Sequence, residues 1–491
     1  MIFNSFEFAA FFTVAYLLFL VVPARFRCWY LVAASFCFYS FVSIFAAGIL
    51  ASVSLLSFCG GLQIAQTRTN PQRQKWWLFG TIGILCAILC YFKYFNFVAA
   101  QFALFLRSAQ SGDLQISALL MPLGLSYFIF QAIGYLVDVY WEKELEANLG
   151  RFLLFMSFFP KVMMGPIERS ESFLPQIRKL EQFNFNYDNF RAGGLLFGWG
   201  LFKKIVVAER LGFYVNEWYA APGQFAGVPI ILAAVFFSFQ LYADFSGYTD
   251  MALGAARLFN FRLIDNFDRP FGATNIQDFW RRWHISFSSW IAAYVFTPLR
   301  MQFRNWGKIG LCAAVLLTFL LLGIWHGTGW TFVAFGLLHG IYICVSTTTL
   351  RTRDRFWEGR NQSAKIWLII SRRLATFAMV SFSFVFFRAT SISHAFEIFG
   401  SMLSMQHFSP LLPSTIVIDR LVTMKAVPEF AVAIAMVIVM EFGELMKHSP
   451  GSPQFFQRPF WLRWTVYAGL VLAILCFGVF TDPNAFIYLN F

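Results

Sequence analysis

Three short stretches of the chain place ionisable side chains within or beside strongly apolar runs, where such groups are costly. In the stretch LGIWHGTGW, His326 follows Trp325 and is surrounded by glycines, which let a backbone or a substrate approach closely. A neutral imidazole can take a proton from a hydroxyl group during group transfer. His326 is therefore a candidate general base, and the alternative is a buried histidine that only supports packing.

The stretch DFWRRWHIS alternates basic and aromatic side chains. Arg281 and Arg282 lie between two tryptophans, which is typical of an anchor at a membrane interface. The functional alternative is a cationic mouth that binds the phosphates of a thioester cofactor, because guanidinium groups match phosphate geometry. In that interpretation His284 adds a group that donates or transfers a proton.

The third stretch, LYADFSGYTD, continues an apolar run and adds Asp244, Tyr248 and Asp250. Carboxylates inside membrane spans mark a pathway or a site, so these side chains and Trp325 are candidates to shape the core. In the alternative interpretation the carboxylates only fix helix packing by pairing with arginine. Arg257 and Arg281 are the candidate partners in that case.

Several other kinds of site find no support in the sequence. His339 lies between Gly336 and Gly340, a spacing that predicts close helix packing. The eight cysteines have the spacing neither of a zinc site nor of a disulfide framework, and we predict no metal site. The sequence contains no G-x-S-x-G, Walker or H-E-x-x-H motif, which argues against serine hydrolases, P-loop ATPases and zinc proteases.

Composition indicates the setting in which these residues must be held. The 491 residues are 58% hydrophobic and only 13% charged, about half the charged share of soluble proteins, which is about 25%. The net charge of +13 is explained by basic loops facing lipid headgroups, and no nucleic-acid motif accompanies it. The sequence therefore predicts an all-α, multi-pass membrane protein, without a cleavable signal peptide.

Apolar runs of about 20 residues are long enough to cross a bilayer. They predict about eleven crossings with further re-entrant or interfacial helices, in a single domain over residues 1–491. The candidate runs are 5–23, 28–46, 47–65, 77–98, 115–139, 151–167, 192–208, 228–246, 309–325, 329–348, 373–388, 427–446 and 464–481. Residues 257–306 are basic, aromatic and only partly apolar, so we expect them inside the protein.

The distribution of lysine and arginine predicts the orientation. Basic residues concentrate in the loops at 66–76 and 351–372, which the positive-inside rule assigns to the cytoplasm. Two basic residues also follow the first span directly. These loops agree in parity and predict an N-terminus outside the cytoplasm.

The order of the motifs resembles the membrane-bound O-acyltransferase family. The similarity is to its bacterial branch, which contains alginate O-acetyltransferase, peptidoglycan O-acetyltransferase and the D-alanyl transferase of teichoic acids. The stretches that carry it are Pro122–Phe128, Tyr135–Tyr140, Phe159–Pro160, Gly165–Ile167, Asp244–Ala252, Arg281–Ser286, Gly323–Gly327 and Phe486–Phe491.

The resemblance implies that His326 matches the family's catalytic histidine and His284 the second histidine of its core. It implies a ring of helices around a thin centre that a tunnel pierces, in a bacterial inner membrane. An acyl donor, for which acetyl-CoA is the expected molecule, would enter from the cytoplasm, and no cofactor would stay bound. The acceptor would be an extracytoplasmic polysaccharide such as alginate, reached directly or through a partner protein of SGNH type.

Three alternatives remain open at this point. The nearest is D-alanyl transfer to teichoic acid from an acyl-carrier protein. A transporter would use Asp244 and Asp250 as an ion site, but it predicts inverted repeats, which the sequence does not contain. A structural scaffold for an export complex would need no buried histidine.

Overall fold

The computed structural model describes residues 3–108, 121–357, 362–404, 426–448, 457–480 and 487. These residues are almost all helical, which confirms the all-α class. The chain divides into two compact units, one formed by Met1–Phe197 with Met251–Ile264 and the other by Gly198–Asp250 with Asp265–Phe491. The expected aromatic terminus at 486–491 lies outside the described residues except for Ile487.

The first unit is built from helices whose starts are set by polar caps. Ser5, Ser43 and Asn148 each accept a hydrogen bond from the first turn of the helix that follows, as N-cap side chains do. The helices up to the start of the second unit are α1 (Phe6–Val21), α2 (Arg27–Ser40), α3 (Ile44–Gln66), α4 (Pro71–Ser108), α5 (Leu125–Tyr140), α6 (Leu149–Ser157), α7 (Ser170–Arg178) and α8 (Tyr187–Phe202).

The second unit contains long helices and several short ones. The α-helices are α9 (Glu209–Ala220), α10 (Val228–Leu258), α11 (Ile276–Arg282), α12 (Ile285–Ile291), α13 (Thr297–Gln302), α14 (Gly307–His326), α15 (Trp330–Trp357), α16 (Gln362–Arg388), α17 (Ile392–Leu403), α19 (Ala426–His448) and α20 (Phe460–Phe477). The short helical turns of the chain are η1 (Ala24–Phe26), η2 (Leu180–Gln182), η3 (Lys203–Ala208), η4 (Pro222–Phe225), η5 (Pro270–Gly272), η6 (Ala292–Phe296) and η7 (Arg304–Trp306). Of these, η3 and η6 are π-helical.

Among the described residues, seven helices are long and apolar enough to cross a membrane, and α1 and α5 are shorter apolar helices. Many of their large apolar side chains are exposed, as expected of surfaces that face lipid. The protein is thus a multi-pass membrane protein, and the total of about eleven crossings stays a prediction. Between the long spans, 257–306 folds into the short helices α11 to α13, and much of 259–291 is buried.

In the first unit, the stretch Pro122–Phe128 contacts the segment that joins Phe159–Pro160 to Gly165–Ile167. Gly124 precedes α5 with a φ of 78°, in the left-handed region that favours glycine. A Cβ atom at this position would collide with the backbone of Val162 and Met163. The buried Lys161 then donates hydrogen bonds to the side-chain oxygen of Gln131 (2.5 Å) and to the carbonyl of Phe155 (2.7 Å).

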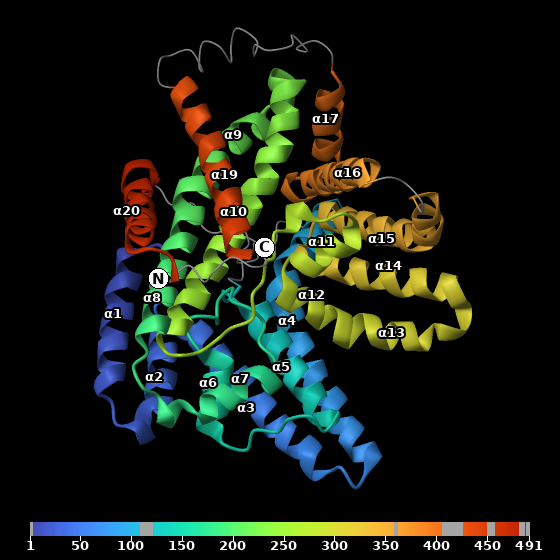
Figure 1. Ribbon diagram of the computed structural model, residues 1–491. Coiled ribbons are helices and arrows are strands. Elements are labelled where there is room, and N and C mark those ends of the chain that lie inside the picture. The colour runs from blue at the N-terminus through green and yellow to red at the C-terminus, as the bar shows by residue number, and fades with distance from the viewer. Residues whose placement is uncertain are drawn as a thin grey trace. The chain divides into compact units, whose positions relative to one another are not determined.

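In the second unit, α14 and α15 form a tight helical hairpin, and they lie side by side in Figure 1. Gly323 and Gly336 face each other, because a Cβ atom on Gly336 would lie 3.0 Å from the Cα atom of Gly323. A Cβ atom on Gly340 would lie 3.1 Å from the side chain of Leu316. The expected close approach around His339 is therefore confirmed, and its physical basis is small residues at a helix crossing.

The orientation can be tested by labelling single cysteines in intact cells. Arg68 follows α3 and Arg355 lies in the last turn of α15; both are exposed and belong to the basic segments that we expect in the cytoplasm. An impermeant thiol reagent added outside should therefore fail to label R68C and R355C proteins above the background of the parent protein. S393C is the control, because Ser393 is exposed beyond the opposite end of α16 and should react. The reverse pattern of labelling would overturn the orientation.

Candidate functional site

His326 is the last residue of α14, where the chain turns towards α15. Its ring lies among aromatic rings, with centroid distances of 4.6 Å to Trp325, 5.1 Å to Phe387 and 5.8 Å to Phe335. The side chain is 5% exposed. Glycine at position 327 is required here, since a Cβ atom would collide with the Phe332 ring.

His284 lies between α11 and α12 in an unusual backbone conformation. Its φ of 45° and ψ of 55° are left-handed, which costs a residue other than glycine about 1–3 kcal/mol and points to function when it occurs in a buried site. His284 occupies the N-cap of α12 without capping that helix through its own side chain. Burial lowers its pKa to about 3, so the imidazole is neutral at neutral pH and is a weak base that can take part in hydrogen bonds.

The structure brings the two histidines to one aromatic pair. The rings of Phe287 and Trp325 are stacked with centroids 4.2 Å apart. The ring of His284 lies 5.1 Å from Phe287 and 6.2 Å from Trp325. His326 lies 6.5 Å from Phe287 and 4.6 Å from Trp325. The predicted site residues from two distant motifs therefore belong to one local cluster, which includes Trp325.

His339, in contrast, is held by its neighbours through both ring nitrogens. The indole N–H of Trp280 donates to Nδ1 over 3.2 Å, so Nε2 carries the ring proton. Nε2 lies 2.8 Å from the hydroxyl of Ser383, which itself donates to the carbonyl of Val380. His339 thus links α11, α15 and α16, which agrees with the packing role predicted for it.

The two arginines of the predicted cationic mouth have different surroundings. Arg282 is half-buried, with Nε 2.9 Å from a carboxylate oxygen of Asp278, one helical turn earlier. It also donates a hydrogen bond of 3.4 Å to the carbonyl of Asp268. Arg281 is exposed, so its guanidinium is accessible to a ligand. The structure therefore separates an accessible arginine from one that holds its own helix in place.

Each of the two carboxylates of α10 is paired with a lysine, a partner that the sequence interpretation did not include. Asp244 lies 2.7 Å from Lys204, and Asp250 lies 2.5 Å from Lys203. Arg257 and Arg281 were the candidate partners in the packing interpretation, whereas Lys203 and Lys204 lie within the run 192–208, which was interpreted as an apolar span. Because both carboxylates are engaged by lysine, the ion site of the transporter alternative loses support.

Further carboxylates complete this buried network. Lys204 also contacts Glu209 (2.6 Å), and Lys203 contacts Glu444 of α19 (3.1 Å). The second oxygen of Asp244 accepts the backbone N–H of Ile487 over 2.7 Å. Charges that leave water need such partners, because an unpaired buried charge is strongly destabilising.

Close backbone contact makes the ion pairs possible. At Gly247, between the two aspartates, a Cβ atom would lie 2.8 Å from the carbonyl of Gly200, in the segment that leads to the lysines. The predicted core residue Tyr248 is buried one residue further along α10, with 1% of its surface exposed. Asp244, Tyr248 and Asp250 therefore belong to the interior, as expected.

The lysine pair was not predicted, although the sequence contains a signal for it. Two adjacent lysines, Lys203 and Lys204, interrupt the run 192–208, and charged groups inside a span indicate a buried partner or a site. Asn266 was also missed. It accepts hydrogen bonds from the two residues after His284, and neither its type nor its position in the sequence predicts that contact.

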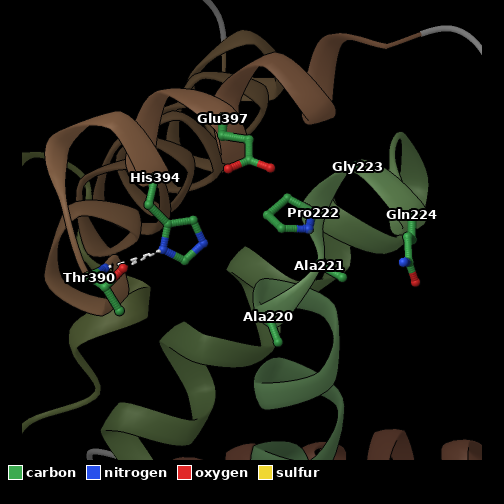
Figure 2. A pocket seen from close by; sticks show the side chains of 8 residues that line it. All are labelled: Ala220, Ala221, Pro222, Gly223, Gln224, Thr390, His394 and Glu397. Atoms are coloured by element: carbon green, nitrogen blue, oxygen red, sulfur yellow. Dashed lines mark hydrogen bonds between the residues drawn. The ribbon is translucent and has the colours of Figure 1, made fainter.

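A recess of about 510 Å³ lies elsewhere in the second unit, where η4 meets α17 (Figure 2). It is lined by Gln224, His394 and Glu397 together with small residues of the α9–η4 turn. The His394 ring is fixed by the hydroxyl of Thr390 (3.0 Å) and the carbonyl of Tyr219 (2.9 Å). None of the predicted catalytic histidines lines this recess, so we assign the chemistry to the cluster around Trp325.

The geometry agrees with comparisons with known proteins. Residues 147–388 match the membrane-bound O-acyltransferase family profile. The chain is 31% identical to a peptidoglycan O-acetyltransferase of Helicobacter pylori, over 94% of this chain and 91% of that protein. It is 31% identical to a probable alginate O-acetylase of Azotobacter vinelandii (82% and 78% covered) and 29% identical to a teichoic acid D-alanyltransferase of Bacillus subtilis (55% and 70%). The chain therefore belongs to the membrane-bound O-acyltransferase family and is an acyltransferase.

Proposed function

We propose that this acyltransferase moves an acetyl group from a cytoplasmic thioester, acetyl-CoA, to a hydroxyl group of an extracytoplasmic polysaccharide. One observation carries the proposal: the rings of His284 and His326 both contact the same aromatic pair, Phe287 and Trp325. Buried aromatic walls keep water away from a thioester, and water would otherwise compete with the acceptor hydroxyl.

In the proposed step, the acceptor oxygen attacks the carbonyl carbon of the thioester and its proton passes to His326. The carbon–sulfur bond then breaks, and the proton is returned to the leaving thiolate, so that the acetyl ester and a free thiol are formed. His284 supports this transfer as a neutral second group beside the same aromatic pair. Burial disfavours its imidazolium form, so in this step His284 acts as a neutral hydrogen-bonding group and the proton passes to His326.

The choice of acetyl over D-alanyl rests on the extent of the similarities. The relatives named as O-acetyltransferase or O-acetylase match 94% and 82% of this chain, whereas the D-alanyltransferase of Bacillus subtilis matches 55%. The names of these relatives refer to peptidoglycan and alginate, which both contain polysaccharide chains. We therefore infer a polysaccharide acceptor and keep D-alanyl transfer to teichoic acid as the alternative.

We further propose a location in a bacterial inner membrane and a partner of the SGNH type on the outer side. Both follow from the family resemblance, since an acceptor outside the cytoplasm must be reached from a donor inside it. A protein that is mostly membrane-spanning has little room for a separate acceptor-binding domain, and a soluble partner would supply one. Co-purification of an SGNH protein with the tagged enzyme would support this arrangement.

The central prediction concerns His326. H326A should lower acetyl transfer by about 10²–10⁴-fold, the usual contribution of a general base. The protein should still insert into the membrane, because the ring lies at a helix end rather than in the middle of a packed span. The measurement is the acetyl content of the surface polysaccharide, normalised to the amount of enzyme in the membrane.

The matched comparison is H339A. His339 is hydrogen-bonded through both nitrogens, so its loss leaves Trp280 and Ser383 with broken hydrogen bonds and should reduce abundance or thermal stability. Its specific activity per folded enzyme should change much less. Near-normal acetylation by H326A would remove the catalytic assignment of that residue.

His284 allows function to be separated from stability. Asparagine adopts the left-handed conformation readily, so H284N should relieve part of a strain of about 1–3 kcal/mol and largely maintain thermal stability. Acetyl transfer should nevertheless fall, because the amide cannot replace the imidazole. Thermal unfolding of the purified protein and acetylation per enzyme give the two readouts. An active H284N protein would show that the imidazole is dispensable.

The two neighbouring arginines should respond differently to alanine. R281A should raise the apparent KM for acetyl-CoA several-fold with little effect on abundance, because the side chain is exposed and is proposed to bind phosphate. R282A should mainly lower abundance, because it removes the pairing with Asp278. Steady-state kinetics in membranes, with enzyme quantified by immunoblot, distinguish these effects. Equal changes in KM for both variants would contradict the separation.

A further inference from the structure

The turn that carries His284 is held by a segment distant in the sequence. The carbonyl of Asn266 accepts the backbone N–H of Ile285 over 2.9 Å. The side-chain oxygen Oδ1 of the same residue accepts the backbone N–H of Ser286 over 3.1 Å. The next residue along, Phe267, forms an antiparallel bridge with Trp283. Asn266 therefore binds the chain directly after His284, and its neighbour binds the chain directly before it.

This contact replaces a cap that His284 does not supply. The first N–H groups of a helix need an acceptor, which is usually the side chain of the N-cap residue. The N-cap of α12 is His284, whose side chain makes no capping hydrogen bond. Asn266 satisfies two N–H groups from outside the helix, with 1% of its surface exposed. The arrangement frees the imidazole from a structural task while the left-handed turn is kept in place.

We propose that Asn266 is a positioning residue for acyl transfer: by capping α12 through Ile285 and Ser286, it holds the His284 imidazole against Phe287 and Trp325. This inference rests on the proposed function, since it concerns the orientation of a histidine assigned to that chemistry. Asn266 itself touches neither the donor nor the acceptor.

The orientation of the Asn266 amide follows from its partner. Ser286 contributes an N–H donor, so the atom that receives it must be the oxygen of the amide. Among the described residues, the amide nitrogen has no hydrogen-bond acceptor. The capping function therefore requires only the oxygen, and aspartate, which ranks with asparagine as a capping side chain, should replace it.

The test compares N266A with N266D in membranes of known enzyme content. N266A removes the acceptor of the Ser286 N–H and should lower turnover at saturating acetyl-CoA by about 10²-fold, the cost of misplacing a reacting group by about 1 Å. The apparent KM for acetyl-CoA should change little, because donor binding is assigned elsewhere. N266D keeps an oxygen at the same distance along the side chain and should recover most of the turnover at its own optimal pH.

Two further variants separate positioning from general loss of stability. N148A removes the side-chain cap of α6, which accepts the N–H of Arg151 over 3.0 Å, and is the matched control for the loss of an asparagine cap. Because Asn148 is exposed, N148A should reduce stability less than N266A does, and it should leave turnover per folded enzyme unchanged. N266L fills the space of asparagine with apolar atoms, so it provides a folded protein without the acceptor if N266A does not fold. It should lose turnover as N266A does.

The outcomes divide clearly. Loss of turnover in N266A or N266L with recovery in N266D supports the positioning role. Normal turnover in folded N266L, or a N266D protein as impaired as N266L, overturns it. If H284A and H326A lose activity while folded N266L does not, the inference fails and the proposed function stands. If H284A and H326A are both active, the proposed function fails irrespective of Asn266.

Discussion

Two lysines removed from water can remain charged only if carboxylates replace the lost hydration, and this requirement organises the second unit. Lys203 and Lys204 are each 1% exposed, and their partners come from α9, α10 and α19. Ion pairs between elements so far apart in the sequence fix the helices to one another, since displacing one helix would leave a buried charge without its partner. Residue 487 is drawn into the same arrangement by its backbone N–H, which donates to Asp244.

The candidate site sits next to this rigid network and depends on it through α10. Phe245, adjacent to Asp244, packs its ring edge-on against the His284 imidazole with centroids 4.7 Å apart. The left-handed turn at His284 thus packs against the ring of Phe245, and Asn266 accepts the N–H groups of the two residues that follow it. Strain of this kind persists only where the surroundings determine the conformation fully, which buried ion pairs and close-packed rings do.

Much of this could be predicted from the sequence, and the failures have physical causes. The apolar runs, the interior position of much of 259–291 and the core histidines could be predicted because charge and glycine inside apolar sequence are conspicuous. The expectation of an interior position was wrong for 292–306, where every residue is at least partly exposed. The partners of Asp244 and Asp250 were not, because sequence proximity favours nearby arginines while ion pairs form wherever helices cross. Likewise, the different surroundings of Arg281 and Arg282 depend on which face of a short helix turns inward, and a seven-residue helix has too little periodicity to show it.

The glycine contact between α14 and α15 has a mechanical consequence. A Cβ atom on Gly336 would lie only 3.0 Å from the Cα atom of Gly323, so the two backbones are in close contact there, with no side chain between them. The hairpin should therefore move as a rigid body, with His326 at the turn between its two helices. Any opening that admits or releases a molecule should then come from movement of the neighbouring helices α12 and α16, which carry Phe287 and Phe387, and not from deformation of the hairpin itself.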